Sequence, residues 1–181
     1  MYEVKEYKDN ITLNNKIKRA FWSICYFFFF KCAKGPLFWN WRVLVLRLFG
    51  AQIGKGCKIY NNAVISEPWN LKIGDVVCIG PYSKLYTGGG ITIGNKVTIS
   101  QYSYLCTESH DISSLNKPFI TKPITIGSFA WICADCFIGM GVEVGEGAVV
   151  GARSAVFKNV ESWAVVGGNP AIFIKQRIIK D

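Results

Sequence analysis

This 181-residue chain contains only one histidine, His110, and that scarcity already limits its chemistry. A zinc site built from three histidines of one chain is excluded. The most apolar run, residues 20–30, is eleven residues long and uncharged, which falls short of the roughly 20 residues that a helix needs to cross a bilayer. Half of the residues are hydrophobic, which argues against disorder.

Acidic residues are also scarce, and the resulting positive charge is unevenly placed. Twelve Asp and Glu stand against 21 Lys and Arg, a formal net charge of +9. Residues 1–50 hold nine Lys/Arg against three acids, while residues 51–181 hold twelve against nine. The surplus forms no stripe along the rest of the chain and no nucleic-acid-binding motif is present, so we expect no nucleic-acid partner. An anionic membrane surface or an anionic cofactor fits this distribution better.

The cysteines indicate a reducing compartment. Their number, seven, is odd, and they are scattered through the chain rather than paired. Residues 1–11 mix charged and polar side chains without the pattern of a secretory signal. We therefore expect a cytoplasmic protein, with peripheral contact at the cytoplasmic face of the membrane as an open alternative.

What the chain has in abundance is a six-residue repeat. Aliphatic residues recur in groups of three at a step of six, at Ile53, Ile59, Ile65, Ile73, Ile79, Leu85, Ile93, Ile99, Leu105, Ile126, Ile132, Ile138, Val144, Val150 and Val156. A Gly often follows, and a small or β-branched residue comes four places after the aliphatic one. A fixed period sustained over fifteen units is the signature of a solenoid.

A six-residue unit predicts an all-β solenoid, a parallel β-helix of triangular cross-section. One short strand would place the aliphatic residue inward, and the following Gly would permit a bend into the next side. Three units make one coil, which gives about five coils. We expect an N-terminal helical arm and cap over residues 1–50, the β-helix over 51–159 with a protruding loop at 106–123, and a C-terminal extension over 160–181.

The N-terminal arm is predicted to contain two helices. The first spans residues 14–34, and it either packs on the β-helix or a subunit contact, or attaches to a membrane interface through its aromatic residues and flanking lysines. The second, Trp39–Phe49, is expected to cap the open end of the first coil.

The interruption between Leu105 and Ile126 is the predicted functional loop, because long excursions from a regular solenoid usually bind or react. It carries His110 beside Asp111. A lone histidine is more often structural, but one placed where the coil breaks out suits a general base acting on a hydroxyl. Catalysis is therefore the preferred interpretation.

Several ordered segments carry a family resemblance. They are the hexapeptide repeat, the Ser109-His110-Asp111 triplet, Trp41-Arg42, Leu46-Arg47-Leu48-Phe49-Gly50-Ala51, Ile124-Thr125-Ile126-Gly127, Trp131-Ile132, Val149-Val150-Gly151-Ala152 and Gly168-Asn169-Pro170-Ala171. Together they resemble the hexapeptide-repeat acyltransferases, within them the galactoside and maltose O-acetyltransferases, and most closely the colanic-acid and exopolysaccharide acetyltransferases. The resemblance covers roughly residues 39–175.

The resemblance implies a left-handed β-helix, a homotrimer, and acetyl-CoA bound between neighbouring subunits. It implies that His110 is the base, that Asp111 orients it or touches the acceptor, and that a backbone N–H stabilises the oxyanion. On the cofactor side it implies contacts from the residues Trp131, Ala134, Ala152, Lys158 and Lys175. Arg177 is added as a phosphate ligand by its charge alone.

One departure affects the acceptor side. Galactoside-type members carry a carboxylate on the corner where this chain has Thr87-Gly88-Gly89-Gly90, so their sugar contacts do not transfer. Tyr82, Tyr86 and Glu108 are the candidate replacements, and each could equally be a packing or solvated residue. Lys175 stands where the galactoside pattern has an arginine.

The sequence thus predicts acetyl-CoA-dependent O-acetylation of a sugar or glycan hydroxyl in capsule or exopolysaccharide biosynthesis, with a lipid-linked acceptor as one option. N-acetylation of an amino-sugar nucleotide and a non-catalytic scaffold are the alternatives. Transfer of a different short acyl group also stays open. No metal is expected, since Cys133 and Cys136 occupy repeat positions and no second cysteine pair exists.

Overall fold

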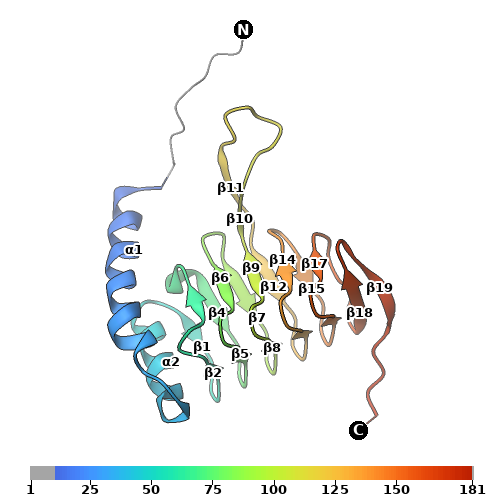
Figure 1. The fold of residues 1–181 in the computed structure, drawn as a ribbon, viewed down its shortest axis with the longest axis horizontal. Helices are drawn as coiled ribbons and strands as arrows, with labels where there is room; N and C mark the ends of the chain where they lie inside the picture. Colours follow the sequence, from blue (N-terminus) through green and yellow to red (C-terminus); the bar gives the residue numbers. More distant parts are fainter. Residues whose placement is uncertain (1–10, 181) are drawn as a thin grey trace.

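The computed structural model describes residues 11–180, which form a parallel β-helix with a helical arm across one end (Figure 1). The strands of successive coils stack into three sheets. The first sheet contains β1 (Gln52–Ile53), β4 (Leu71–Ile73), β7 (Ile91–Ile93), β12 (Ile124–Ile126) and β15 (Glu143–Val144). The second contains β2 (Lys58–Ile59), β5 (Cys78–Ile79), β8 (Thr98–Ile99), β13 (Trp131–Ile132), β16 (Val149–Val150), β18 (Ala164–Gly168) and β19 (Ala171–Gln176). The third contains β3 (Val64–Ile65), β6 (Lys84–Tyr86), β9 (Tyr104–Cys106), β14 (Phe137–Ile138) and β17 (Ala155–Val156).

The repeat positions form the core, as the sequence predicts. Ile59, Ile79 and Ile99 stack in register on one another in the second sheet and are all fully buried. The small residues four places later, such as Ala63 and Ala148, are also fully buried. Each buried isoleucine contributes on the order of 2 kcal/mol of hydrophobic stabilisation, so the regular stack is the main source of stability.

The glycines of the repeat have a different role from the one expected. The bend itself is made two positions later, by residues with left-handed backbones such as Val76 (φ 59°) and Tyr82 (φ 59°). Gly74 is needed because a Cβ there would lie 2.4 Å from Asn95 Oδ1 and 2.9 Å from the Gly94 carbonyl carbon in the next coil. Glycine at this place therefore permits close stacking of coils.

The β-helix is also longer than the five predicted coils, reaching about six turns. Val160 pairs with Val144, β18 pairs in parallel with β16, and β19 then folds back antiparallel on β18. The sequence count missed this turn because Val160 follows Val156 by four residues rather than six or eight. Val160 and Val166 are nonetheless buried like the earlier repeat residues.

The helical arm covers the open end of the first coil. It consists of α1 (Leu13–Cys25), a π-helical turn (Tyr26–Lys31), a 3-10 turn (Pro36–Phe38) and α2 (Trp39–Leu48). These agree with the two expected helices, except that the α-helical part of the first ends at Cys25. Within residues 11–180, no helix is long and apolar enough to span a membrane.

One side-chain donor from the arm reaches the edge strand of each sheet. Arg47 Nε donates to Ile53 O in β1 (3.1 Å), Arg42 Nε to Ile59 O in β2 (2.6 Å), and Trp22 Nε1 to Ile65 O in β3 (2.7 Å). Unpaired strand edges invite pairing with other chains, and these donors occupy their carbonyls. These contacts agree with the capping role predicted for the second helix, and α1 contributes the donor to the third sheet.

Candidate active site

His110 lies on a hairpin that leaves the β-helix at the corner between the third and first sheets. The hairpin pairs β10 (Glu108–His110) with β11 (Phe119–Thr121), and it projects from the coils as the tallest loop in Figure 1. His110 stands opposite Phe119, and the two rings make an edge contact at 5.8 Å. The predicted excursion at 106–123 is therefore an ordered strand pair that presents His110 at the surface.

The His110 ring is oriented by the backbone. Its Nδ1 lies 2.7 Å from the Lys117 carbonyl oxygen, which can only accept a hydrogen bond. Nδ1 therefore carries the proton in this contact, and in the neutral ring the lone pair is on Nε2. A lone pair on a ring nitrogen of an exposed histidine is what a general base requires.

Asp111 is bonded elsewhere in the hairpin. Its Oδ1 accepts from Ser113 N (2.9 Å) and Ser113 Oγ (2.6 Å), and these bonds lower the pKa of the Asp111 carboxyl. The orienting contact on His110 Nδ1 thus comes from Lys117, while Asp111 closes the turn that follows. A contact between Asp111 and the acceptor stays a prediction.

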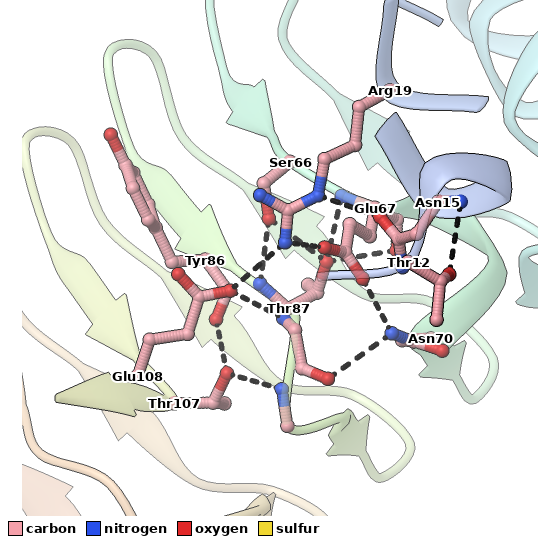
Figure 2. A network of polar contacts seen from close by, with 12 residues as sticks. Thr12, Asn15, Arg19, Ser66, Glu67, Asn70, Tyr86, Thr87, Thr107 and Glu108 are labelled. Carbon is pink, nitrogen blue, oxygen red and sulfur yellow. Dashed lines mark hydrogen bonds and ion pairs between the residues drawn. The ribbon is translucent and has the colours of Figure 1, made fainter. Parts of the chain in front are cut away.

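Two of the three acceptor-side candidates lie together near His110. Tyr86 and Glu108 belong to neighbouring coils at the corner where the hairpin begins, and Figure 2 shows them close together. Glu108 Oε1 accepts from Gly88 N at 3.1 Å. Burial raises the pKa of Glu108, Arg19 lowers it, and Glu67 raises it. Tyr82 lies apart, between the second and third sheets, where it stacks on Tyr102 at 5.2 Å.

The predicted cofactor residues lie on sheets and corners of the β-helix other than the corner that carries the His110 hairpin. Trp131 is in β13 of the second sheet, half exposed, with Nε1 donating to Ser100 Oγ (3.0 Å). Ala134 and Ala152 are at the corner between the second and third sheets, joined by the bond from Arg153 N to Ala134 O (2.9 Å). One chain therefore does not bring these three residues and His110 to a single face.

The basic candidates gather toward the C-terminal end. Lys158 is exposed at a corner that lines a hollow of about 450 Å³, and Lys175 is exposed on β19. Arg177 is partly buried, and its Nη1 donates to Phe129 O and Gly147 O, both at 2.9 Å. Arg177 thus links two coils through these hydrogen bonds, a structural contact that its charge alone did not predict.

The cysteine pair has the packing role assigned to it. Cys136 is buried, its Sγ lies 3.1 Å from Gly151 O, and burial raises the pKa of its thiol and that of Cys133. In the part of the chain that the structure describes, no three His, Cys, Asp or Glu side chains come together as a metal site.

Sequence reasoning missed two charged residues of the site, Arg19 and Glu67. Arg19 projects from α1 and forms an ion pair with Glu67, which is only 1% exposed. The sequence shows Glu67 as a glutamate at a repeat corner. Nothing in the repeat pattern links Glu67 to Arg19, which lies 48 residues earlier in a helix.

Comparisons with known proteins agree with this fold. No protein-family model matches the sequence. The chain is 47% identical over 140 residues to the putative colanic acid biosynthesis acetyltransferase WcaF of Escherichia coli K12, covering 77% of each chain. A hexapeptide-repeat acetyltransferase of Vibrio cholerae, solved with acetyl-CoA, superposes with a TM-score of 0.83 at 24% identity, over 96% of this chain and 94% of the other. A galactoside acetyltransferase in complex with coenzyme A gives 0.83 at 23%, over 92% and 84%.

The two structural likenesses confirm the fold, the left-handed parallel β-helix that the resemblance implied. The sequence identity to WcaF goes further, because it extends over more than three quarters of both chains. This chain therefore belongs to the family of colanic acid biosynthesis acetyltransferases, within the hexapeptide-repeat acyltransferases.

Proposed function

We propose that this protein transfers the acetyl group of acetyl-CoA to a hydroxyl of a sugar or glycan during exopolysaccharide biosynthesis. The observation that carries the proposal is the His110 ring, exposed on a projecting hairpin with Nδ1 bonded to a carbonyl oxygen. The proposal is also supported by the 47% identity of this chain to a putative colanic acid biosynthesis acetyltransferase. The solved neighbours with bound acetyl-CoA or coenzyme A support the donor.

The chemistry is direct transfer. His110 Nε2 takes the proton of the acceptor hydroxyl as its oxygen attacks the thioester carbonyl carbon, and a backbone N–H stabilises the resulting oxyanion. The C–S bond then breaks, the acetyl ester forms, and the proton on His110 passes to the departing thiolate. This path needs no nucleophile from the protein, so none of the cysteines is assigned that role.

The active site is proposed to be completed in a homotrimer. Trp131, Ala134 and Ala152 occupy the second sheet and its corner with the third, whereas the His110 hairpin leaves the corner between the third and first sheets. A neighbouring subunit can bring its own donor-side residues to this hairpin. In that arrangement Trp131 contacts the thioester end, the two alanine backbones follow the pantetheine arm, and Lys158, Lys175 and Arg177 serve the phosphates.

The helical arm is proposed to contact the cytoplasmic face of the membrane and to bring the protein to a lipid-linked acceptor. Large apolar side chains are exposed along the arm, and together they are called the aromatic face: Leu13, Ile17, Phe21, Ile24, Phe27, Phe28, Phe29, Leu37, Trp41, Leu44 and Leu48. Residues 11–50 carry seven Lys/Arg and no Asp or Glu. Aromatic and aliphatic side chains beside lysines suit the headgroup region of an anionic bilayer.

The proposed activity is tested by following free thiol release. The purified protein is incubated with acetyl-CoA and a panel of methyl hexosides, sugar nucleotides, amino sugars and lipid-linked oligosaccharides. We expect acceptor-dependent thiol release and an ester-linked acetyl group on a hydroxyl acceptor. Transfer confined to amino acceptors would replace O-acetylation by N-acetylation, and failure to bind coenzyme A would leave the scaffold interpretation.

A further inference from the structure

A buried polar network joins α1 to the corner from which the His110 hairpin departs. Its members come from three successive coils and from α1, and Figure 2 shows the Glu67 and Glu108 carboxylates turned toward the Arg19 guanidinium group. Glu67 follows β3, Thr87 follows β6, and Glu108 follows β9. The network therefore runs parallel to the β-helix axis and ends two residues before His110.

Glu67 is bonded within this network through both its side chain and its backbone. Its Oε2 accepts from Asn70 Nδ2 (2.7 Å), its Oε1 forms an ion pair with Arg19 Nη2, and within residues 11–180 no other donor is in hydrogen-bond geometry to Oε1. Its backbone is tied to Thr87, whose Oγ1 accepts from Glu67 N (2.9 Å) and donates to Glu67 O (2.8 Å). An ionised carboxylate this deeply buried is costly unless it is paired, so the contact with Arg19 is required.

Arg19 is shared between two carboxylates. Its Nη2 also lies 3.9 Å from Glu108 Oε1, and its Nε donates to Asn15 Oδ1 (2.8 Å) one helical turn earlier. The guanidinium is therefore held by α1 on one side and by Glu67 on the other. Glu108 is then the carboxylate that the other two residues position.

The Gly88 corner is shaped to receive the Glu108 carboxylate. A Cβ at Gly88 would lie 2.0 Å from Glu108 Oε1, and Gly88 does not have a left-handed backbone, so a side chain there would displace the Glu108 carboxylate. Gly88 N donates to that same oxygen. The next amide, Gly89 N, donates to Thr107 Oγ1 (2.9 Å), which fixes the start of β10. The corner that lacks a carboxylate of its own thus holds one from the following coil.

Glu108 and His110 point to the same side of β10. They are two residues apart in a strand, where side chains alternate between faces, so their Cα atoms are about 6.6 Å apart. Glu108 Oε1 is occupied by Gly88 N and Arg19, whereas no described residue is bonded to Oε2, and 14% of the side chain is exposed. A sugar presents neighbouring hydroxyls, and a carboxylate oxygen accepts a hydrogen bond from one of them.

We propose that Arg19 and Glu67 are positioning residues that hold the Glu108 carboxylate at the Gly88 corner, where Glu108 binds an acceptor hydroxyl beside the one that His110 deprotonates. The inference rests on the proposed function and extends it to the acceptor side. It makes α1 a wall of the acceptor site, and it identifies the acceptor class as a polyol with at least two neighbouring hydroxyls. The other titratable groups around Glu108 are Tyr86, Tyr104 and Cys106.

The test compares steady-state constants for the acceptor and for acetyl-CoA, with the best methyl hexoside of the panel as the probe. Glu108→Gln should raise the acceptor KM about tenfold, because a charge-assisted bond is replaced by a weaker one, and should leave the acetyl-CoA KM within about twofold. Arg19→Gln should raise the acceptor KM about fivefold, and Arg19→Lys should restore most of the loss. Combining Arg19→Gln with Glu108→Gln should add nothing to Glu108→Gln alone, since Arg19 acts through Glu108.

Folding defects are controlled with a second pair of variants. Arg19→Gln leaves the buried Glu67 charge unpaired, so Arg19→Gln/Glu67→Gln removes both charges together, and it should fold and still show the raised acceptor KM. Lys58→Gln removes an exposed charge from β2 and should behave as wild type. An unchanged acceptor KM in Arg19→Gln, or additive effects in the Arg19/Glu108 double variant, would overturn the inference while the proposed function stands. Absence of wild-type turnover on every acceptor would overturn both.

Discussion

The imidazole Nδ1 of His110 lies 2.7 Å from the carbonyl oxygen of Lys117, across the hairpin that projects from the β-helix. The base of the proposed reaction thus has a backbone carbonyl oxygen as the partner of its Nδ1. A carbonyl fixes the tautomer without adding a charge next to the ring, and its position depends on the conformation of the loop that follows β10.

The side chain at position 117 should matter little and its backbone conformation should matter more. Lys117 has a left-handed backbone (φ 44°). Lys117→Gly keeps this conformation accessible, so kcat should stay within about threefold of wild type. Lys117→Val places a β-branched residue there at a cost of about 1–2 kcal/mol, which should loosen the carbonyl contact and lower kcat by roughly tenfold. Equal kcat values for the two variants would show that the contact with Lys117 does not orient His110.

Arg42 should be the most important single residue for closing the first coil. It is 1% exposed, and its guanidinium donates to the carbonyls of Ala33, Gly35 and Ile59. Arg42→Met would leave three carbonyls without this donor, so we expect a loss of about 3 kcal/mol in the free energy of unfolding and a Tm lower by about 6–12 °C. Arg47→Met, at a more exposed cap, should lose about 1 kcal/mol. Matching Tm values for the two variants by calorimetry would contradict the burial argument.

Glu108→Gln should improve stability at neutral pH while it impairs acceptor binding. Burial and Glu67 raise the pKa of Glu108 in the folded chain, so its stabilising contribution is complete below the pKa of an unfolded glutamate and is lost as pH rises through the folded pKa. The Tm of Glu108→Gln should therefore equal that of wild type at acidic pH and exceed it by a few degrees at pH 7. A variant that is less stable than wild type at pH 7 would mean that the ionised carboxylate stabilises the fold.

The aromatic face should bind anionic bilayers. Phe27, Phe28 and Phe29 are each more than half exposed, and the triple substitution by Gln should reduce flotation with vesicles containing phosphatidylglycerol at least tenfold. Binding should also weaken with added salt and on neutral vesicles. Phe173→Gln changes an exposed aromatic residue on β19 and serves as the matched control. If the triple variant instead dissociates in light scattering, the aromatic face is a subunit contact.

Much of the fold could be predicted from the sequence because each repeat unit repeats the same local physics. Ile59, Ile79 and Ile99 occupy equivalent places, so a step of six identifies strands, core and coils at once. The sixth turn was missed because Val160 breaks the step, although its burial depends on stacking over Val144. Stacking acts between residues sixteen apart and is not visible as a local period.

The site was predicted only in part, for the same reason. His110 was found because the repeat fails around it, and Glu108 was found because it adjoins His110. The pairing of Arg19 with Glu67 depends on how α1 lies across the coils, and no local pattern contains that orientation. The separation of Trp131 from His110 in one chain likewise appears only when the three sheets are assembled.

The most direct test of the account is the turnover of His110→Ala with acetyl-CoA and the best acceptor of the panel. Removing a general base should lower kcat by about 10²–10⁴-fold, while the acetyl-CoA dissociation constant should stay within about threefold of wild type because the hairpin side chain is not needed to hold the donor. A His110→Ala variant that keeps more than about a tenth of the wild-type kcat would contradict the assignment of His110 as the base.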